Sequence, residues 1–196
     1  MADPTVVGRQ RCGWAESAPE YVAYHDEEWG RPLHGETALF ERLSLEAFQS
    51  GLSWLVILRK RSAFRAAFAG FDPPSVAGFD ERDVARLLAD AGIVRNRAKI
   101  DATIENARRV VALDTPLDEL LWSFAPDPAG RVRPAGLADV PATSPESKAM
   151  ATELKRRGFR FVGPTTVYAM MQACGVVDDH LAGCFVRAEL DRPAPG

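Results

Sequence analysis

The sequence predicts an all-α fold, and three observations lead to this prediction. Apolar residues recur at helical spacing in several segments, residues that begin and end helices flank these segments, and no convincing segment alternates as a strand would. With 196 residues, 46% of them hydrophobic, the chain is long enough for one domain with a substantial core. We expect a single helical domain of two lobes over residues 11–185, a disordered N-terminus over 1–10 and a flexible tail over 186–196.

The first half of the chain contains four segments with clear helical periodicity. Helices are predicted over 37–50, from 54 to about 67, over 80–88 and from 96 to about 113. Gly51 would end the first helix and Ser53 would cap the second. Gly92 would end the third. These signals divide the first half into short helices joined by tight connections.

A loop rich in proline and glycine over 125–142 precedes the remaining helices. Helices are predicted over 145–157 and 164–174, followed by a short one that Asp179 would cap and that would carry His180 and Cys184. Ser144 is a suitable cap for the first of these, because Pro145 occupies the first helical position, where proline is favoured.

Two pairs of cysteine and histidine lie near opposite ends of the chain: Cys12 with His25, and His180 with Cys184. Thiolate and imidazole are ligands that Zn²⁺ prefers, and four of them suit a closed tetrahedral site. One zinc ion held by all four would join the N-terminal and C-terminal segments. Because the spacing is not that of a standard zinc finger, the pattern also fits buried cysteines and ordinary surface or core histidines.

Composition argues against several classes of protein. No apolar run reaches transmembrane length and the N-terminus has no apolar signal segment, so we expect a cytoplasmic protein without a membrane partner. Three cysteines do not make a disulfide framework. Because the net charge is −3, any binding to nucleic acid would depend on a local basic face.

The segment 155–166 has the features of a grip on a phosphate backbone. A basic stretch precedes Gly158, a short connection reaches Gly163, and the following helix offers free N–H groups at its N-terminus. This pattern is that of a helix–hairpin–helix. It also fits an ordinary pair of helices with a solvated basic edge. The basic residues at 59–61 and 95–99 are candidates for two further basic edges.

Aromatic residues gather in the first part of the sequence, together with one acid at the margin of an apolar helix face. The aromatic residues are Trp14, Tyr21, Tyr24, Trp29 and Trp54, and the acid is Glu46. Aromatic faces beside a carboxylate suit a flat cationic ring with N–H donors. Core packing of the aromatic residues and a salt bridge to Glu46 would explain the same pattern without a ligand.

Several short motifs occur in order along nearly the whole folded chain. They are Arg11–Trp14, Tyr24–Gly30, Leu45–Trp54, Arg157–Gly163, Met171–Gly175 and Asp179–His180. With these motifs the chain closely resembles the constitutive 3-methyladenine DNA glycosylase I (TAG) family over about residues 11–185. The resemblance implies a helix–hairpin–helix fold and the excision of 3-methyladenine from alkylated double-stranded DNA in base-excision repair. It also implies one structural zinc ion on Cys12, His25, His180 and Cys184.

The resemblance assigns further roles residue by residue. Glu46 matches the glutamate that recognises the base, which we take as the catalytic residue. The positions that match the base pocket are Tyr21, Tyr24, Trp54 and Trp14; those that match DNA contacts are Gln49, Leu52, Gly158, Phe159, Gly163, Thr165 and Thr166. We expect a monomer that releases free 3-methyladenine and, because no lysine is evidently placed to form an imine, lacks lyase activity.

Asp178 lies where many helix–hairpin–helix glycosylases carry a catalytic aspartate, in a Val-Asp-x-His sequence. The TAG family often has asparagine there. The carboxylate could stabilise positive charge on the sugar, or it could be an acid at a helix N-terminus. We expect the second role, because the resemblance implies a reaction that does not require this carboxylate.

The chemistry of 3-methyladenine favours a mechanism with few catalytic steps. Methylation at N3 makes adenine cationic and weakens its glycosidic bond, so the enzyme has to flip the nucleotide, select the charged base and admit water. Two other functions fit parts of the sequence: a zinc-containing DNA-binding module without catalysis, and a zinc hydrolase. The hydrolase is disfavoured because catalytic zinc usually keeps an open position and four protein ligands are available here.

Overall fold

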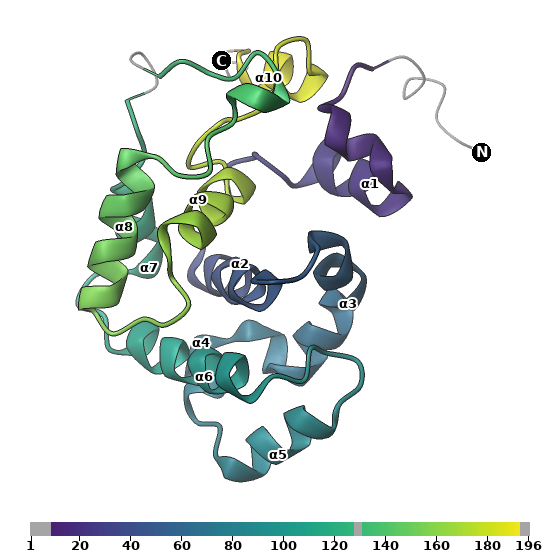
Figure 1. Ribbon diagram of the computed structural model, residues 1–196. Helices are drawn as coiled ribbons and strands as arrows, with labels where there is room; N and C mark the ends of the chain where they lie inside the picture. The colour runs from purple at the N-terminus through teal and green to yellow at the C-terminus, as the bar shows by residue number, and fades with distance from the viewer. Residues whose placement is uncertain (1–8, 128–130, 193–196) are drawn as a thin grey trace.

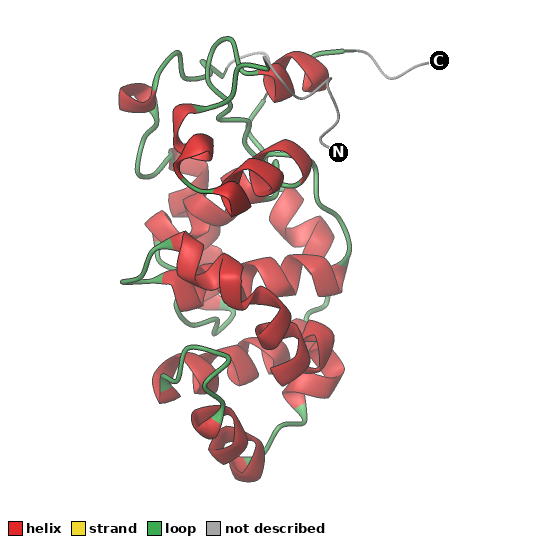
Figure 2. Cartoon of the chain, turned by 90° about the vertical axis from the view of Figure 1, so that its right-hand side faces the viewer, coloured by secondary structure: helices red, strands yellow, loops and turns green. Residues whose placement is uncertain are grey.

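The computed structural model describes residues 9–127 and 131–192, and every regular element in these residues is helical (Figure 2). The α-helices are α1 (Pro19–Glu27), α2 (Glu36–Gln49), α3 (Trp54–Ala67), α4 (Pro73–Ala77), α5 (Glu81–Ala89), α6 (Arg97–Val111), α7 (Leu117–Trp122), α8 (Pro145–Arg156), α9 (Pro164–Ala173) and α10 (Phe185–Leu190). Short 3₁₀ helices occupy Gly13–Ser17, Ala69–Phe71 and Leu137–Asp139. The all-α prediction is confirmed for the part of the chain that is described.

Helix α2 lies at the centre of the molecule, and the other helices pack around it (Figure 1). It contacts α3, α6, α7 and α9, and α8 packs against α9 on the outside. The residues from Leu39 to Phe48 are buried except the half-buried Glu41, so α2 is enclosed along most of its length. Because α2 is buried all round, polar residues on it face other residues or a cavity instead of bulk water.

Local sequence signals account for most of the helix boundaries. Helix α3 has the predicted bounds, and the Ser144 side chain accepts a hydrogen bond from the backbone of Ser147 at the start of α8. Asp80 and Asn96 cap α5 and α6 in the same way. Each cap satisfies a backbone N–H that has no partner within its own helix.

The C-terminal part differs from the prediction. His180 and Cys184 do not share a helix: residues 177–184 form turns and loops, and Cys184 is the residue before α10. Gly183 has a φ of 82°, a conformation that interrupts a helix at this point. Helix α10 lies in the segment expected to be a flexible tail, and its Val186 is fully buried, so helical structure extends past residue 185.

The two ends of the described chain lie together at one end of the molecule (Figure 1). The backbone N–H of Phe185 donates to the carbonyl of Gln10 at 2.9 Å, which joins the N-terminal segment to the start of α10. Residues 1–8 of the expected disordered N-terminus and 193–196 of the expected tail lie outside the described residues. Among the residues that are described, no helix has the length and apolar character needed to cross a bilayer.

Candidate base pocket and metal site

A cavity of about 230 Å³ opens between α1, α2, α3 and α9. It is lined by Trp14, Tyr21, Tyr24, Trp29, Glu46, Gln49, Trp54, Ala169 and Gln172. The fold therefore brings together the five aromatic residues and the acid that the sequence singled out. The contribution of α9 was not foreseen, because Ala169 and Gln172 have no distinctive pattern in the sequence.

Glu46 lies on α2 and is only 4% exposed. Burial raises the pKa of its carboxyl group to about 7, although the nearby Arg42 guanidinium acts in the opposite direction. None of the described residues donates a hydrogen bond to this side chain. A buried carboxyl group whose hydrogen-bonding capacity is unused is costly to the fold, and a ligand with N–H donors and positive charge would satisfy it.

Arg42 lies one turn before Glu46 on α2 and is also buried. Its Nη1 donates to the Tyr24 hydroxyl at 2.9 Å, and its guanidinium carbon lies 5.3 Å from the centre of the Tyr24 ring and 5.6 Å from that of Trp54. Arg42 therefore fixes an aromatic wall and supplies a charge close to Glu46. Sequence reasoning missed it; its signal was an arginine four residues before Glu46 on an apolar helix.

The aromatic residues of the cavity pack edge to face around it. Trp14 lies 5.6 Å from Tyr21 and 5.1 Å from Trp29 between ring centres, and Tyr24 lies 5.5 Å from Trp54. The Trp54 indole Nε1 is buried and has no hydrogen-bond partner among the described residues. The wall thus offers ring faces together with one unused donor.

Gln172 reaches the cavity from α9, and a hydrogen bond to Asp179 fixes its side-chain amide. Its Nε2 donates to Asp179 at 2.7 Å, and Asp179 also accepts from the Tyr168 hydroxyl at 2.7 Å and pairs with Arg131. Because the carboxylate binds the amide nitrogen, the amide carbonyl of Gln172 stays available as an acceptor. Sequence reasoning quoted the motif around Gln172 but assigned it no role.

The turn between α2 and α3 carries two of the residues expected to contact DNA. Gln49 lines the cavity, and Leu52 is 39% exposed, which is unusual for a large apolar residue. Gly51 between them has a φ of 82°, so a residue with a side chain would be strained there. The turn places Leu52 beside the cavity with its side chain partly in solvent.

The connection between α8 and α9 runs from Arg157 to Gly163. Gly158 has a φ of 88°, as its expected role at the helix end requires. Phe159 is only 4% exposed, so its side chain packs into the core and is not available to touch DNA. Thr165 is exposed and Thr166 half-buried at the start of α9.

The charges around this connection are only partly free. Arg156 and Arg157 form ion pairs with Glu153, whereas Lys155 and Arg160 are exposed and have no acidic partner among the described residues. The turn therefore carries two available cations.

The two other basic edges are not borne out by the side-chain contacts. Arg59 and Arg61 pair with acids of α1 and the loop after it, and Lys60 donates to backbone carbonyls. Arg97 pairs with Glu81, and Lys99 is buried. Arg95 is exposed and has no acidic partner among the described residues, so intramolecular partners occupy most, but not all, of the charge on these two edges.

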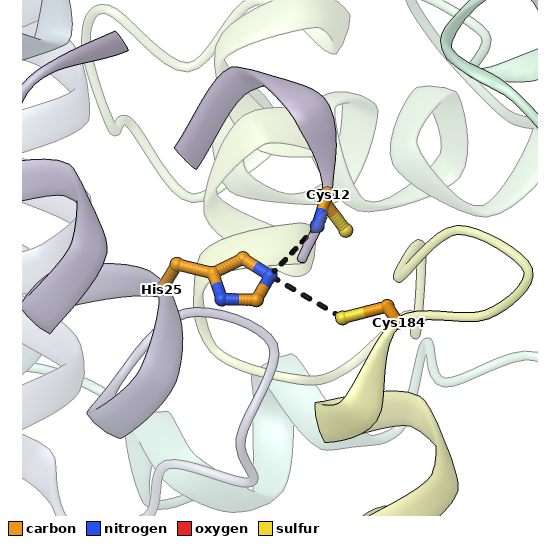
Figure 3. Close-up of side chains that lie close together, drawn as sticks. All are labelled: Cys12, His25 and Cys184. Carbon is orange, nitrogen blue, oxygen red and sulfur yellow. Dashed lines mark hydrogen bonds between the residues drawn. The ribbon is translucent and has the colours of Figure 1, made fainter. Parts of the chain in front are cut away.

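Cys12, His25 and Cys184 converge from three segments of the chain (Figure 3). Their ligand atoms all lie within 4.8 Å of one another, and all three residues are buried. His25 Nε2 lies 3.4 Å from Cys184 Sγ, and His25 Nδ1 lies 2.8 Å from Asp26. A carboxylate on the second nitrogen is the usual support of a histidine ligand, so these three residues could hold a metal ion.

His180 lies beside these three residues but is not among those whose ligand atoms all lie within 4.8 Å of one another. Its ring centre is 5.3 Å from that of His25, and its Nε2 is buried without a hydrogen-bond partner among the described residues. Its Nδ1 lies 2.9 Å from Asp178. A Cβ atom at Gly30 would lie 2.3 Å from His180 Cε1, so the ring is held closely in place. The unpaired Nε2 of His180 has the chemistry of a metal ligand.

Asp178 faces His180 and Arg133 and does not line the aromatic cavity. Burial alone would raise the pKa of its carboxyl group, but hydrogen bonds from His180 and Arg133 outweigh burial and lower the pKa to about 2. The carboxylate is thus ionised and fully engaged. It is neither a free acid at the cavity nor a cap of the predicted helix, which does not exist.

The family model described as methyladenine glycosylase matches residues 14–187. The chain belongs to the methyladenine glycosylase family. Its sequence is 46% identical over 178 residues to DNA-3-methyladenine glycosylase 1 of Escherichia coli K12, covering 89% of this chain and 95% of the relative.

Solved structures of methyladenine glycosylases share the fold. A crystal structure of 3-methyladenine DNA glycosylase I (TAG), 46% identical, superposes with a TM-score of 0.84 and covers 90% of this chain and 98% of its own. A variant of the same type of enzyme in complex with 3-methyladenine is 33% identical, with a TM-score of 0.82, and covers 89% of this chain and 95% of its own. The resemblance seen in the sequence motifs is thus confirmed.

Proposed function

We propose that this protein is a DNA-3-methyladenine glycosylase that excises the damaged base from alkylated DNA by hydrolysis. The observation that carries the proposal is the buried Glu46 carboxyl group in an aromatic cavity, within a chain that belongs to the methyladenine glycosylase family. The family supplies the reaction, and the cavity supplies a physical reason why this chain would perform it.

The cavity favours a cationic base over a neutral one. A positive ring in the cavity, against the walls formed by Tyr24 and Trp54, would gain about 0.5–2 kcal/mol from the aromatic faces. It would also keep Glu46 ionised, because opposite charge stabilises the carboxylate against its burial. The exocyclic N–H groups of the base would donate to Glu46 and to the Gln172 carbonyl, a contact that adenine paired in the duplex cannot make.

The reaction itself needs little acid catalysis. The bond between the sugar C1′ and the base breaks, and its electron pair neutralises the positive base. Water adds to C1′ and releases a proton. In this scheme Glu46 binds the base and stabilises its charge until departure, which agrees with its place in the cavity. Asp178 takes no part, because His180 and Arg133 already engage its carboxylate.

DNA would approach the side of the molecule where the two turns lie. The α8–α9 pair acts as a helix–hairpin–helix, in which the backbone N–H groups of Gly163, Thr165 and Thr166 and the free cations Lys155 and Arg160 contact phosphates. Leu52 is suited to fill the space that the flipped nucleotide leaves in the duplex, and Gln49 to contact bases beside it.

The metal ion would be zinc, and its role would be structural. Cys12, His25 and Cys184 supply three ligands, and the buried unused Nε2 of His180 makes it the fourth. A zinc ion bound there would join the N-terminal segment and α1 to the loop before α10. It would also hold Trp14 and Trp29 at the cavity, since both rings pack on the histidines.

The composition of the cavity supports a glycosylase without lyase activity. A lyase needs a lysine amine at the cavity, and none of the described residues that line it is a lysine. Lys60 on α3 and Lys99, which reaches the end of α2, both donate to backbone carbonyls.

The test is incubation of the protein with methylated DNA and chromatography of the released bases. We expect free 3-methyladenine and an intact strand that carries abasic sites. Release of no base alongside tight DNA binding would favour the non-catalytic DNA-binding module. A covalent adduct trapped by borohydride would contradict the monofunctional mechanism.

A further inference from the structure

Helix α6 carries two buried polar side chains that reach loops elsewhere in the chain. Lys99 is 7% exposed and Asn106 is 1% exposed, although neither residue type is usually buried. They are seven residues apart, about two helical turns, so they lie on the same side of α6. Buried polar groups persist only when their hydrogen bonds are made, and here the partners are backbone atoms of two turns.

Lys99 fixes the turn between α2 and α3. Its Nζ donates to the carbonyls of Phe48 at 2.8 Å and Ser50 at 2.6 Å. These carbonyls belong to the C-terminal end of α2, where partners within the helix run out and a positive charge is favourable. Gln49 lies between the two carbonyls, and Leu52 follows two residues after Ser50. The ammonium therefore sets the position of both residues proposed to probe the duplex.

Asn106 fixes the turn between α8 and α9. Its Nδ2 donates to the carbonyl of Arg160 at 3.0 Å, and its Oδ1 accepts from the Arg160 backbone N–H at 2.8 Å. The next residue, Phe161, has a φ of 56° and is 39% exposed. A residue with a side chain seldom adopts this conformation, so the surrounding structure has to hold it there. The paired hydrogen bonds from Asn106 provide that restraint.

We propose that α6 is a common anchor for the two DNA-facing turns, with Lys99 and Asn106 as positioning residues. The proposal rests on the proposed function, since it assumes that both turns contact one duplex. Phosphates and the flipped base lie at fixed separations on that duplex, so two contacts made together require two turns of fixed separation. Helix α6, which holds both turns through buried side chains, provides this fixed separation.

The experiment compares Lys99→Met and Asn106→Leu with a matched control, Thr103→Val. Thr103 is buried on α6 between the other two, and its Oγ1 donates to the Lys99 carbonyl at 2.9 Å within the helix, so it touches neither turn. For each variant, three quantities are measured: amide hydrogen exchange over residues 50–54 and 158–163, affinity for a duplex with an abasic site, and affinity for free 3-methyladenine.

We expect each variant to raise exchange in its own turn and to weaken duplex binding by about tenfold or more. Affinity for free 3-methyladenine should fall much less than duplex affinity, because Glu46 and the aromatic walls are untouched and Gln49 alone links an anchored turn to the cavity. Lys99→Arg should recover part of the lost duplex binding, since it keeps the charge. Thr103→Val should leave exchange in both turns, and duplex affinity, at wild-type values.

Two outcomes separate this proposal from the proposed function. Wild-type exchange in both turns of Lys99→Met and Asn106→Leu would overturn the anchor role whatever the activity, and so would equal losses of duplex and free-base affinity in these variants. A wild-type protein that releases no base from methylated DNA would overturn the proposed function alone.

Discussion

Replacing Glu46 with glutamine should make the protein more stable at pH 8 and less active. The carboxyl group is buried, which raises its pKa from an ordinary value of 4.5 to about 7 in the folded protein. At pH values between these two pKa values the folded state binds more protons than the unfolded state, so the free energy of unfolding falls as the pH rises. Above about pH 7 the whole cost of the buried charge is present. Glutamine keeps the shape and carries no charge at any pH.

The size of the effect follows from the pKa difference. A rise from 4.5 to about 7 corresponds to about 3 kcal/mol between the two protonation states of Glu46. The stability of Glu46→Gln relative to the wild type should therefore grow by about 3 kcal/mol between pH 4 and pH 8. This cost would be offset in the complex, where a cationic base compensates the carboxylate, so the same change should weaken excision by about tenfold or more.

The assay is denaturant unfolding of both proteins at pH 4, 6 and 8, with single-turnover excision measured in parallel. The control is Glu36→Gln, an exposed acid at the start of the same helix, whose stability difference should stay small. A constant difference for Glu46→Gln across this pH range would refute the reasoning, as would a variant less stable than the wild type at pH 8.

Three further predictions concern the metal site and the charges near the cavity. Cys184→Ala should lose the bound zinc, measured by mass spectrometry, and melt at lower temperature; Cys174→Ala should keep it, because Cys174 lies in the apolar core. Asp178→Asn should weaken zinc affinity by about 10–100-fold and leave excision by the zinc-loaded enzyme nearly unchanged. If Asp178→Asn abolished excision while Glu46→Gln remained active, the catalytic role would belong to Asp178 instead of Glu46. Arg42→Met should move the rise of kcat/KM with pH to higher pH, because Arg42 lowers the pKa of Glu46; an unchanged profile would contradict this.

Much of the fold could be predicted because its signals are local. Helix α3 has the predicted bounds and Ser144 caps α8 as expected, since a cap depends on residues only two or three positions apart. The Ser53 side chain, expected to cap α3, makes no cap hydrogen bond. The short helices α1, α4 and α7 were not predicted. Pro19 begins α1, but few apolar residues follow it in a helical pattern, so packing of the tertiary structure decides its formation.

The cavity shows a similar division. Aromatic residues and Glu46 stand out by residue type, whereas Gln172 enters from a helix more than 100 residues away in sequence and resembles any polar residue. The proposed basic edges failed for a related reason: Arg61 pairs with Glu28 and Arg97 with Glu81, and such partners are set by tertiary contacts. A run of charges in the sequence does not reveal which of them are already paired.

The burial of the thiols has a consequence for a protein that works among alkylating agents. The reagents that methylate adenine are electrophiles, and a thiolate is a better nucleophile than a nucleobase. Cys12, Cys174 and Cys184 are 0%, 0% and 2% exposed, so the folded chain presents almost no sulfur surface to such a reagent. The chemical that creates the substrate would then inactivate the protein only as fast as the cysteines become exposed. Resistance to the damaging agent becomes a property of the opening rate of the fold, which contacts such as the hydrogen bond between Phe185 and Gln10 oppose.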